Sequence, residues 1–164
     1  MADETATPAL RLRPARAGEA SLLSELALRS KSHWGYPPAF LEACRAELTL
    51  SADYLNASPV FVLEESERVV GFYGLREQGS ELELLYLFVE PLAINRGYGK
   101  RLWAHAVEMA AKLGFQKIKI ESDPYAEAFY QAMGARRTGV VHSALQAGRT
   151  LPIMEFLLDP ERVI

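Results

Sequence analysis

The sequence has little of several features that would mark particular classes of protein. It contains one cysteine, Cys44, and therefore cannot form an internal disulfide, which fits a reducing compartment. No apolar run approaches the roughly 20 residues that a membrane-spanning helix needs. Its 18 basic and 21 acidic side chains are interspersed and leave a net charge of -3, without the basic excess typical of nucleic-acid binders. We therefore expect neither a membrane nor a nucleic acid as a partner.

The N-terminal stretch also lacks the features of a secretory signal. Residues 1–9, MADETATPA, have early acidic side chains and no basic segment followed by an apolar one. No repeat or low-complexity linker divides the remainder, and 49% of the sequence is hydrophobic, enough for one core. We interpret 1–9 as a flexible tail and 10–164 as a single domain of a cytoplasmic protein.

The pattern of apolar residues predicts an α+β fold with a mixed, mostly antiparallel central sheet. Alternation and turn signals predict about seven strands, at 10–16, 59–65, 68–77, 81–90, 117–122, 137–144 and 151–158. A period near 3.6 predicts four flanking helices, at 18–34, 39–48, 100–113 and 126–133. The fourth and fifth strands are joined through the long third helix, so they should run parallel if they share a sheet.

Two closely spaced glycines, Gly97 and Gly99, stand where this long helix begins, in the stretch INRGYGKR. A helix start exposes up to four unpaired N–H groups and a partial positive charge, and glycine lets a ligand approach the backbone. With Arg96 and Lys100 beside them, the glycines predict a phosphate or pyrophosphate seat. A tight turn that binds nothing is the alternative. The stretch lacks the G-x-x-x-x-G-K-S/T spacing of the P-loop. It also fails the dinucleotide fingerprint G-x-G-x-x-G, because Leu102 stands where the third glycine would be.

The segment LFVEPLAINRGYGKRL resembles the phosphate motif of the GNAT family of acetyl-CoA-dependent N-acetyltransferases. In that family Q/R-x-x-G-x-G/A follows a strand that ends V-x-P, and Val89, Pro91, Gly97 and Gly99 occupy the matching positions. A second stretch, AEAFYQAMGA, is similar to the family motif A-x-x-F-Y-x-x-x-G. The predicted order of elements between residues 10 and 158 also resembles that of the family, which implies the GNAT-like fold.

Three positions depart from the family pattern, and one of them is Asn95, which stands where the family usually has a glycine after the Q/R position. Ile94 stands at the Q/R position and offers no hydrogen bond to a diphosphate, so Arg96 is the first candidate to replace that interaction. Asp123 stands where the family often has asparagine, and an ionised carboxylate accepts hydrogen bonds but cannot donate them. The resemblance implies a cofactor site formed by Phe88, Val89, Asn95, Arg96, Gly97, Tyr98, Gly99, Lys100 and Asp123.

A carboxylate on the fourth predicted strand is the candidate general base. Glu83 lies on an otherwise apolar strand, at the offset from the motif valine where some GNAT members have a glutamate base. Glu81 shares its face and is the alternative, and exposure of both to solvent is the competing interpretation. His105 falls on the polar face of the long helix and is rejected as the base, whereas His33 and His142 stay open.

The tyrosine of the second motif, Tyr130, is the candidate general acid. By resemblance it lies beside the thioester sulfur, and a phenol with an ordinary pKa of about 10 can protonate a departing thiolate. Packing of the ring against the sheet is the alternative, a role for which Phe129 is better suited. The resemblance also implies that the fourth and fifth strands splay apart near Phe88 and Val89. Their backbone groups would then bind the pantetheine arm like an added strand and polarise the thioester carbonyl.

Aromatic residues gather between the first two predicted helices, in SKSHWGYPP. His33, Trp34 and Tyr36 are close enough in sequence to enclose a small acceptor. The alternative is that Trp34 and Tyr36 only cover the hydrophobic core where the first helix ends. Tyr73 and Arg149 are further candidates for the acceptor cleft.

The sequence thus predicts an N-acetyltransferase that moves an acetyl group from acetyl-CoA to a primary amine, most naturally of a small molecule, by direct attack in a ternary complex. A non-catalytic acyl-CoA-binding module is one alternative, and acetylation of a protein N-terminus or lysine is another. We expect acetyl-CoA as the cosubstrate and no metal, and the resemblance is compatible with a homodimer.

Overall fold

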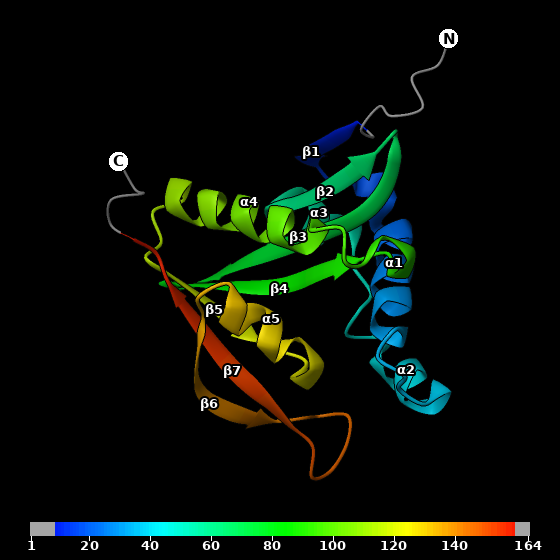
Figure 1. The fold of residues 1–164 in the computed structure, drawn as a ribbon, viewed down its shortest axis with the longest axis vertical. Helices are drawn as coiled ribbons and strands as arrows, with labels where there is room; N and C mark the ends of the chain where they lie inside the picture. The colour runs from blue at the N-terminus through cyan, green and yellow to red at the C-terminus, as the bar shows by residue number, and fades with distance from the viewer. Residues whose placement is uncertain (1–8, 160–164) are drawn as a thin grey trace.

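The computed structural model describes residues 9–159, which form a seven-stranded sheet with helices on both of its faces (Figure 1). The strands are β1 (Leu10–Pro14), β2 (Val60–Glu65), β3 (Arg68–Gln78), β4 (Glu81–Val89), β5 (Lys117–Glu121), β6 (Arg136–His142) and β7 (Thr150–Leu157). The α-helices are α1 (Ala20–Ser32), α2 (Pro38–Cys44), α3 (Ala52–Ala57), α4 (Tyr98–Lys112) and α5 (Glu127–Ala132). Short 3₁₀ helices are η1 (Ala17–Glu19), η2 (Pro91–Ala93) and η3 (Pro124–Ala126).

The strand order is β1-β2-β3-β4-β5-β7-β6, with β4 and β5 parallel and the other neighbouring pairs antiparallel. This confirms the predicted fold class and the predicted parallel pair. The prediction omitted α3, whose six residues are too few to show a helical period. The sequence does mark the start of α3 with Ser51, whose hydroxyl caps the helix by accepting a hydrogen bond from Tyr54 N. Of the tail predicted over 1–9, residues 1–8 lie outside the described part of the sequence.

Two apolar cores lie on opposite faces of the sheet because successive strand residues point to opposite sides. Leu63 and Tyr73 pack with α4 and α5, whereas their neighbours Val62 and Phe72 pack with α1, α2 and α3. Cys44 belongs to the second core and is 1% exposed, so it is a buried residue of that core. Within the described residues, no helix has both the length and the apolar character to cross a membrane.

The sheet opens between its two parallel strands. β4 and β5 pair at Leu82 with Ile118 and at Glu83 with Lys119. Over residues 84–89, the edge of β4 that faces β5 has no strand partner among the described residues. In Figure 1 the ribbon of β4 correspondingly diverges from those of β5, β6 and β7. The expected splay of these strands is therefore present, and it exposes backbone groups of β4 to an opening.

A β-bulge in β4 contributes to this divergence. Gly74 pairs with Tyr86 and the next residue, Leu75, pairs with Leu84, so Leu85 is the extra residue. Such a bulge bends the strand that contains it and increases its local twist. The bulge lies close to the last β4–β5 pair, which places the bend where the two strands separate.

Candidate active site

The opening between β4 and β5 leads into a cavity of about 760 Å³, within the range of small-molecule sites. Its walls come from β4, the start of α4, the segment between β5 and α5, the C-terminal end of α1, and the β6–β7 hairpin. Most of the residues predicted for catalysis or cofactor binding line it, namely Glu83, Phe88, Val89, Asn95, Gly97, Tyr98, Gly99, Lys100, Asp123 and Tyr130.

The start of α4 presents backbone N–H groups to the cavity without a protein cap. Gly97 is the N-cap residue, in the left-handed conformation with φ of 80°, and as a glycine it has no side chain to cap the first turn. The first turn also contains no acidic residue, whereas Lys100 adds a cation at the cavity wall. A Cβ on Gly99 would lie 3.3 Å from the Phe129 ring, so a larger residue there would press on α5. This arrangement is a seat for an anion.

Arg96 forms an ion pair with an acidic side chain outside the cavity. Its guanidinium pairs with Glu65 at 3.3 Å, its side chain is 55% exposed, and it is not part of the cavity wall. In this structure the Arg96 guanidinium is paired with Glu65, and its hydrogen bond to a bound diphosphate in place of Ile94 stays a prediction. Lys100 is the cation that lines the cavity at this seat.

Glu83 lies on the cavity wall with a side chain that is 12% exposed. The guanidinium of Arg76, on β3, donates to both of its carboxylate oxygens, at 3.1 and 3.3 Å. Glu81, the alternative base, is exposed and does not line the cavity. Of the two histidines left open, His142 lies at the wall and His33 does not.

Tyr130, on α5, has a buried ring that packs edge-on against Trp103 and Phe129. No residue in 9–159 forms a hydrogen bond with its hydroxyl, and the ring lines the cavity. Burial raises the pKa of Tyr130, with a smaller contribution from the charge of Asp123. The hydroxyl therefore stays protonated at neutral pH and is available to a ligand.

Two residues predicted for the acceptor cleft lie elsewhere. Tyr73 is fully buried on the face of β3 that packs against α4, and its hydroxyl is 2.6 Å from His105 Nδ1. The prediction that Tyr73 reaches the cleft is wrong, because strand alternation turns it to the opposite face of the sheet. His33 is exposed outside the cavity and contacts Trp34 edge-on at 5.3 Å. His105 is half-buried, and burial lowers its pKa.

Trp34 lines the cavity, where its ring stacks on that of Tyr125 with 5.5 Å between centroids. The stack joins the end of α1 to η3 across the cavity. Tyr36 lies behind the wall and packs against Phe40 at 4.7 Å. Trp34 therefore forms part of the surface at this end of the cavity, and Tyr36 packs behind it.

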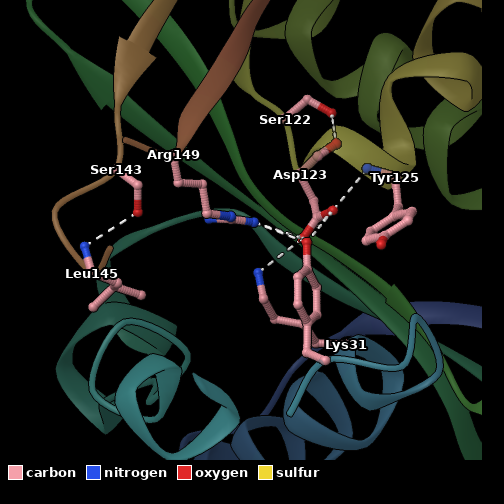
Figure 2. Close-up of polar contacts among 8 residues, drawn as sticks. Lys31, Ser122, Asp123, Tyr125, Ser143, Leu145 and Arg149 are labelled. Carbon is pink, nitrogen blue, oxygen red and sulfur yellow. Dashed lines mark hydrogen bonds and ion pairs between the residues drawn. The ribbon is translucent and has the colours of Figure 1, made fainter. Parts of the chain in front are cut away.

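Asp123 is the centre of a polar cluster at this end of the cavity, which we call the Asp123 cluster: Lys31, Tyr36, Asp123 and Arg149 (Figure 2). The carboxylate accepts from the Tyr36 hydroxyl at 2.9 Å, from Lys31 Nζ at 3.1 Å and from Tyr125 N at 2.8 Å. Arg149 donates to the Tyr36 hydroxyl at 2.9 Å and lies 3.6 Å from the carboxylate. Sequence reasoning missed Lys31, which looks like a solvated residue at the end of a helix.

The Tyr36 hydroxyl is uncharged within this cluster. Burial and the neighbouring carboxylate of Asp123 raise the pKa of Tyr36 to about 12, although the hydrogen bond from Arg149 acts in the opposite direction. The hydroxyl therefore keeps its proton at neutral pH, donating to Asp123 while accepting from Arg149.

Comparison with known families agrees with this fold and cavity. Residues 25–135 match the model of the Acetyltransferase (GNAT) family, a match that spans the open edge of β4 and the start of α4. The chain belongs to this family, and the protein is a GNAT acetyltransferase.

Solved structures of low sequence identity share the fold. PaiA N-acetyltransferase from Thermoplasma acidophilum, in complex with coenzyme A, is 19% identical with a TM-score of 0.75, covering 91% of this protein and 99% of that one. The ribosomal-protein-S18-alanine N-acetyltransferase from Escherichia coli is 14% identical with a TM-score of 0.69, covering 92% and 94%. The yncA protein from Salmonella typhimurium, with its cofactor acetyl-CoA, is 19% identical with a TM-score of 0.65, covering 92% and 95%.

Proposed function

We propose that the protein transfers the acetyl group of acetyl-CoA to a primary amine of a small molecule, by direct attack in a ternary complex. One observation supports this proposal above the others: a single cavity joins an uncapped helix start to an unpaired strand edge. The first feature suits a diphosphate, and the second suits the extended, amide-containing pantetheine arm.

Each of the two features is assigned one part of the cofactor. The backbone N–H groups at the start of α4, with the ammonium of Lys100, hold the diphosphate. The edge of β4 over residues 84–89 holds the pantetheine arm as an added strand would be held. PaiA, solved with coenzyme A, and yncA, solved with acetyl-CoA, share this fold, which supports coenzyme A as the group bound here.

The chemistry needs no protein nucleophile. Glu83 accepts a proton from the acceptor ammonium, directly or through water, and the neutral amine attacks the thioester carbonyl. The N–H of Val89 or its neighbour stabilises the oxyanion as the C–N bond forms. When the C–S bond breaks, Tyr130 donates its proton to the departing thiolate, and the proton that the attacking nitrogen loses restores the Tyr130 hydroxyl, so the products are the amide and free coenzyme A thiol. The buried surroundings that raise the pKa of Tyr130 also penalise a thiolate, which favours protonation of the sulfur.

Interactions across the cavity favour a small acceptor over a protein one. The Trp34–Tyr125 stack and the Tyr36–Asp123 hydrogen bond both join the end of α1 and its following loop to the segment after β5. These two contacts narrow the end of the cavity where we propose that the acceptor binds. Transfer to a protein needs an open groove and is the second candidate; the Escherichia coli structure of this fold is named for acetylating an alanine of ribosomal protein S18.

The direct test measures free thiol released from acetyl-CoA in the presence of a panel of primary amines. We expect release that depends on both acetyl-CoA and at least one small amine. Saturable binding of coenzyme A without thiol release for any amine or peptide would instead establish a non-catalytic binding module. Release with peptides alone would establish a protein acetyltransferase.

Replacing Glu83 with glutamine is expected to lower kcat by about 10- to 100-fold and to flatten the rising limb of the pH–rate profile, because the base is removed while its shape is kept. Glu81→Gln is the matched control, since it removes a carboxylate from the same strand outside the cavity and should leave the profile unchanged. A Glu83→Gln profile that superimposes on that of the wild type would exclude Glu83 as the base.

A further inference from the structure

The Asp123 cluster contains more positive than negative charge. Lys31 and Arg149 share the single carboxylate of Asp123, and Tyr36 is uncharged, so the cluster has a net charge of +1. Among the described residues, neither cation has a second acidic partner within ion-pair distance. A surplus cation at the wall of a cavity is a binding determinant for an anion.

Burial makes this surplus costly unless an anion compensates it. The side chains of Lys31, Asp123 and Arg149 are 15%, 15% and 14% exposed, and all three line the cavity. Partly desolvated charge is unfavourable unless it is paired. The cavity surface beside the cluster therefore gains most from a ligand that brings a negative charge.

The Arg149 guanidinium is held in position before any ligand arrives. It lies 4.8 Å above the Phe40 ring and 5.4 Å above the Tyr36 ring, and the backbone carbonyl oxygen of Arg149 accepts from Ser143 N at 2.8 Å. One guanidinium nitrogen donates to the Tyr36 hydroxyl, which leaves other N–H groups of the planar fork without acceptors among the described residues. A fixed guanidinium fork matches the two oxygens of a carboxylate.

The same cavity also offers negative charge for an ammonium group. Glu83, on β4, and Glu47, in the segment between α2 and α3, line its walls, and the Glu83 carboxylate also accepts from Arg76. A ligand that fits both kinds of charge has an amine and an anionic group in one molecule.

We propose that the acceptor is an amino-acid-like amine whose carboxylate is bound by Arg149 and Lys31 in the Asp123 cluster. This inference rests on the proposed function and specifies the substrate class. The amine is directed toward the thioester at β4, and Asp123 and Tyr36 act as positioning residues that orient the two cations. Arg149 and Lys31 are then specificity determinants rather than groups that take part in the proton transfers.

The test compares amines that differ by one carboxylate: tryptophan with tryptamine, tyrosine with tyramine, and ornithine with putrescine. In at least one pair, the wild type should show a kcat/KM about tenfold or more higher for the carboxylate-bearing member, the effect of one charge-assisted hydrogen bond. Arg149→Gln and Lys31→Met should each remove that preference by raising KM for the amino acid. The KM for acetyl-CoA should stay within about twofold of the wild-type value.

Arg137→Gln is the control, because it removes an exposed guanidinium that pairs with Glu127 outside the cavity, and it should retain the preference. Equal or higher kcat/KM for the decarboxylated member of every pair would overturn the inference and leave the proposed function standing. A rise in the KM for acetyl-CoA alone would also overturn it, since the cluster would then serve the cofactor.

A calorimetric titration of the coenzyme A complex with the N-acetylated products separates the substrate class from the activity itself. We expect the N-acetylamino acids to bind the wild type and to bind Arg149→Gln about tenfold or more weakly. Equal binding of the N-acetylamines and N-acetylamino acids, or no binding of either, would overturn the inference. Absence of thiol release with every amine would overturn the proposed function, whatever the titration shows.

Discussion

Replacing Gly97 with glutamate is expected to weaken coenzyme A binding by at least about 100-fold, equivalent to roughly 2.7 kcal/mol. Gly97 has φ of 80°, which costs other residues about 1–2 kcal/mol and would shift the amides that follow it. Its Cβ would have no protein atom within 4 Å, so the new carboxylate would extend from the cavity wall where the diphosphate is expected. Calorimetric titration with coenzyme A measures the change.

Gly114→Glu provides a matched control for this effect. Gly114 follows the same helix, has φ of 86° and likewise would have no atom within 4 Å of a Cβ, but it lies away from the cavity. The control introduces the same strain and the same charge, and its affinity for coenzyme A should equal that of the wild type. An unchanged affinity of Gly97→Glu for coenzyme A would show that the diphosphate does not bind at the start of α4.

Replacing Tyr130 with phenylalanine is expected to lower kcat by about 100-fold while leaving the Kd for coenzyme A within about twofold. The substitution removes only the hydroxyl, which has no protein partner among the described residues, and keeps the ring packed between Trp103 and Phe129. The thiolate would then leave without a proton donor. Steady-state kinetics together with a coenzyme A titration separate the two effects.

Tyr54→Phe is the corresponding control, because the Tyr54 hydroxyl donates to Leu75 O at 2.8 Å outside the cavity. That variant should lose stability but keep kcat. Wild-type kcat in Tyr130→Phe would exclude Tyr130 as the acid and leave it as a packing residue.

The arrangement of the strands could be predicted from the sequence because alternation and short polar turns act locally. The stretch from β2 to β4 consists of apolar runs joined by two-residue turns, which specify antiparallel neighbours. The bulge at Leu85 could not be predicted, because it depends on how β4 packs between β3 and the opening beside β5. The short helix α3 was missed for want of a period, even though Ser51 marks its start.

Site residues could be predicted where a motif lies on a single helix or strand. They could not be predicted where side chains from several helices and strands meet. Gly97, Gly99 and Tyr130 lie at the cavity wall because the backbone of their own helices places them there. The side chain of Tyr73 was misplaced and the ion pair between Arg96 and Glu65 was not foreseen, since strand facing and ion pairing depend on neighbours distant in sequence.

The Asp123 cluster shows the same limit most clearly. Lys31 and Asp123 are 92 residues apart, and Tyr36 and Arg149 are 113 residues apart. No local pattern brings such residues together. Asp123 stood out in the sequence only because it departs from the family asparagine, and in the structure its carboxylate gives two cations a negative charge that the asparagine side chain would lack.

A crystal structure of the complex with coenzyme A tests the central claim most directly. We predict that the diphosphate lies within hydrogen-bond distance of backbone nitrogens in residues 97–100, with the pantetheine arm along residues 84–89 of β4. A diphosphate bound elsewhere, with the first turn of α4 contacted only by solvent, would contradict that claim.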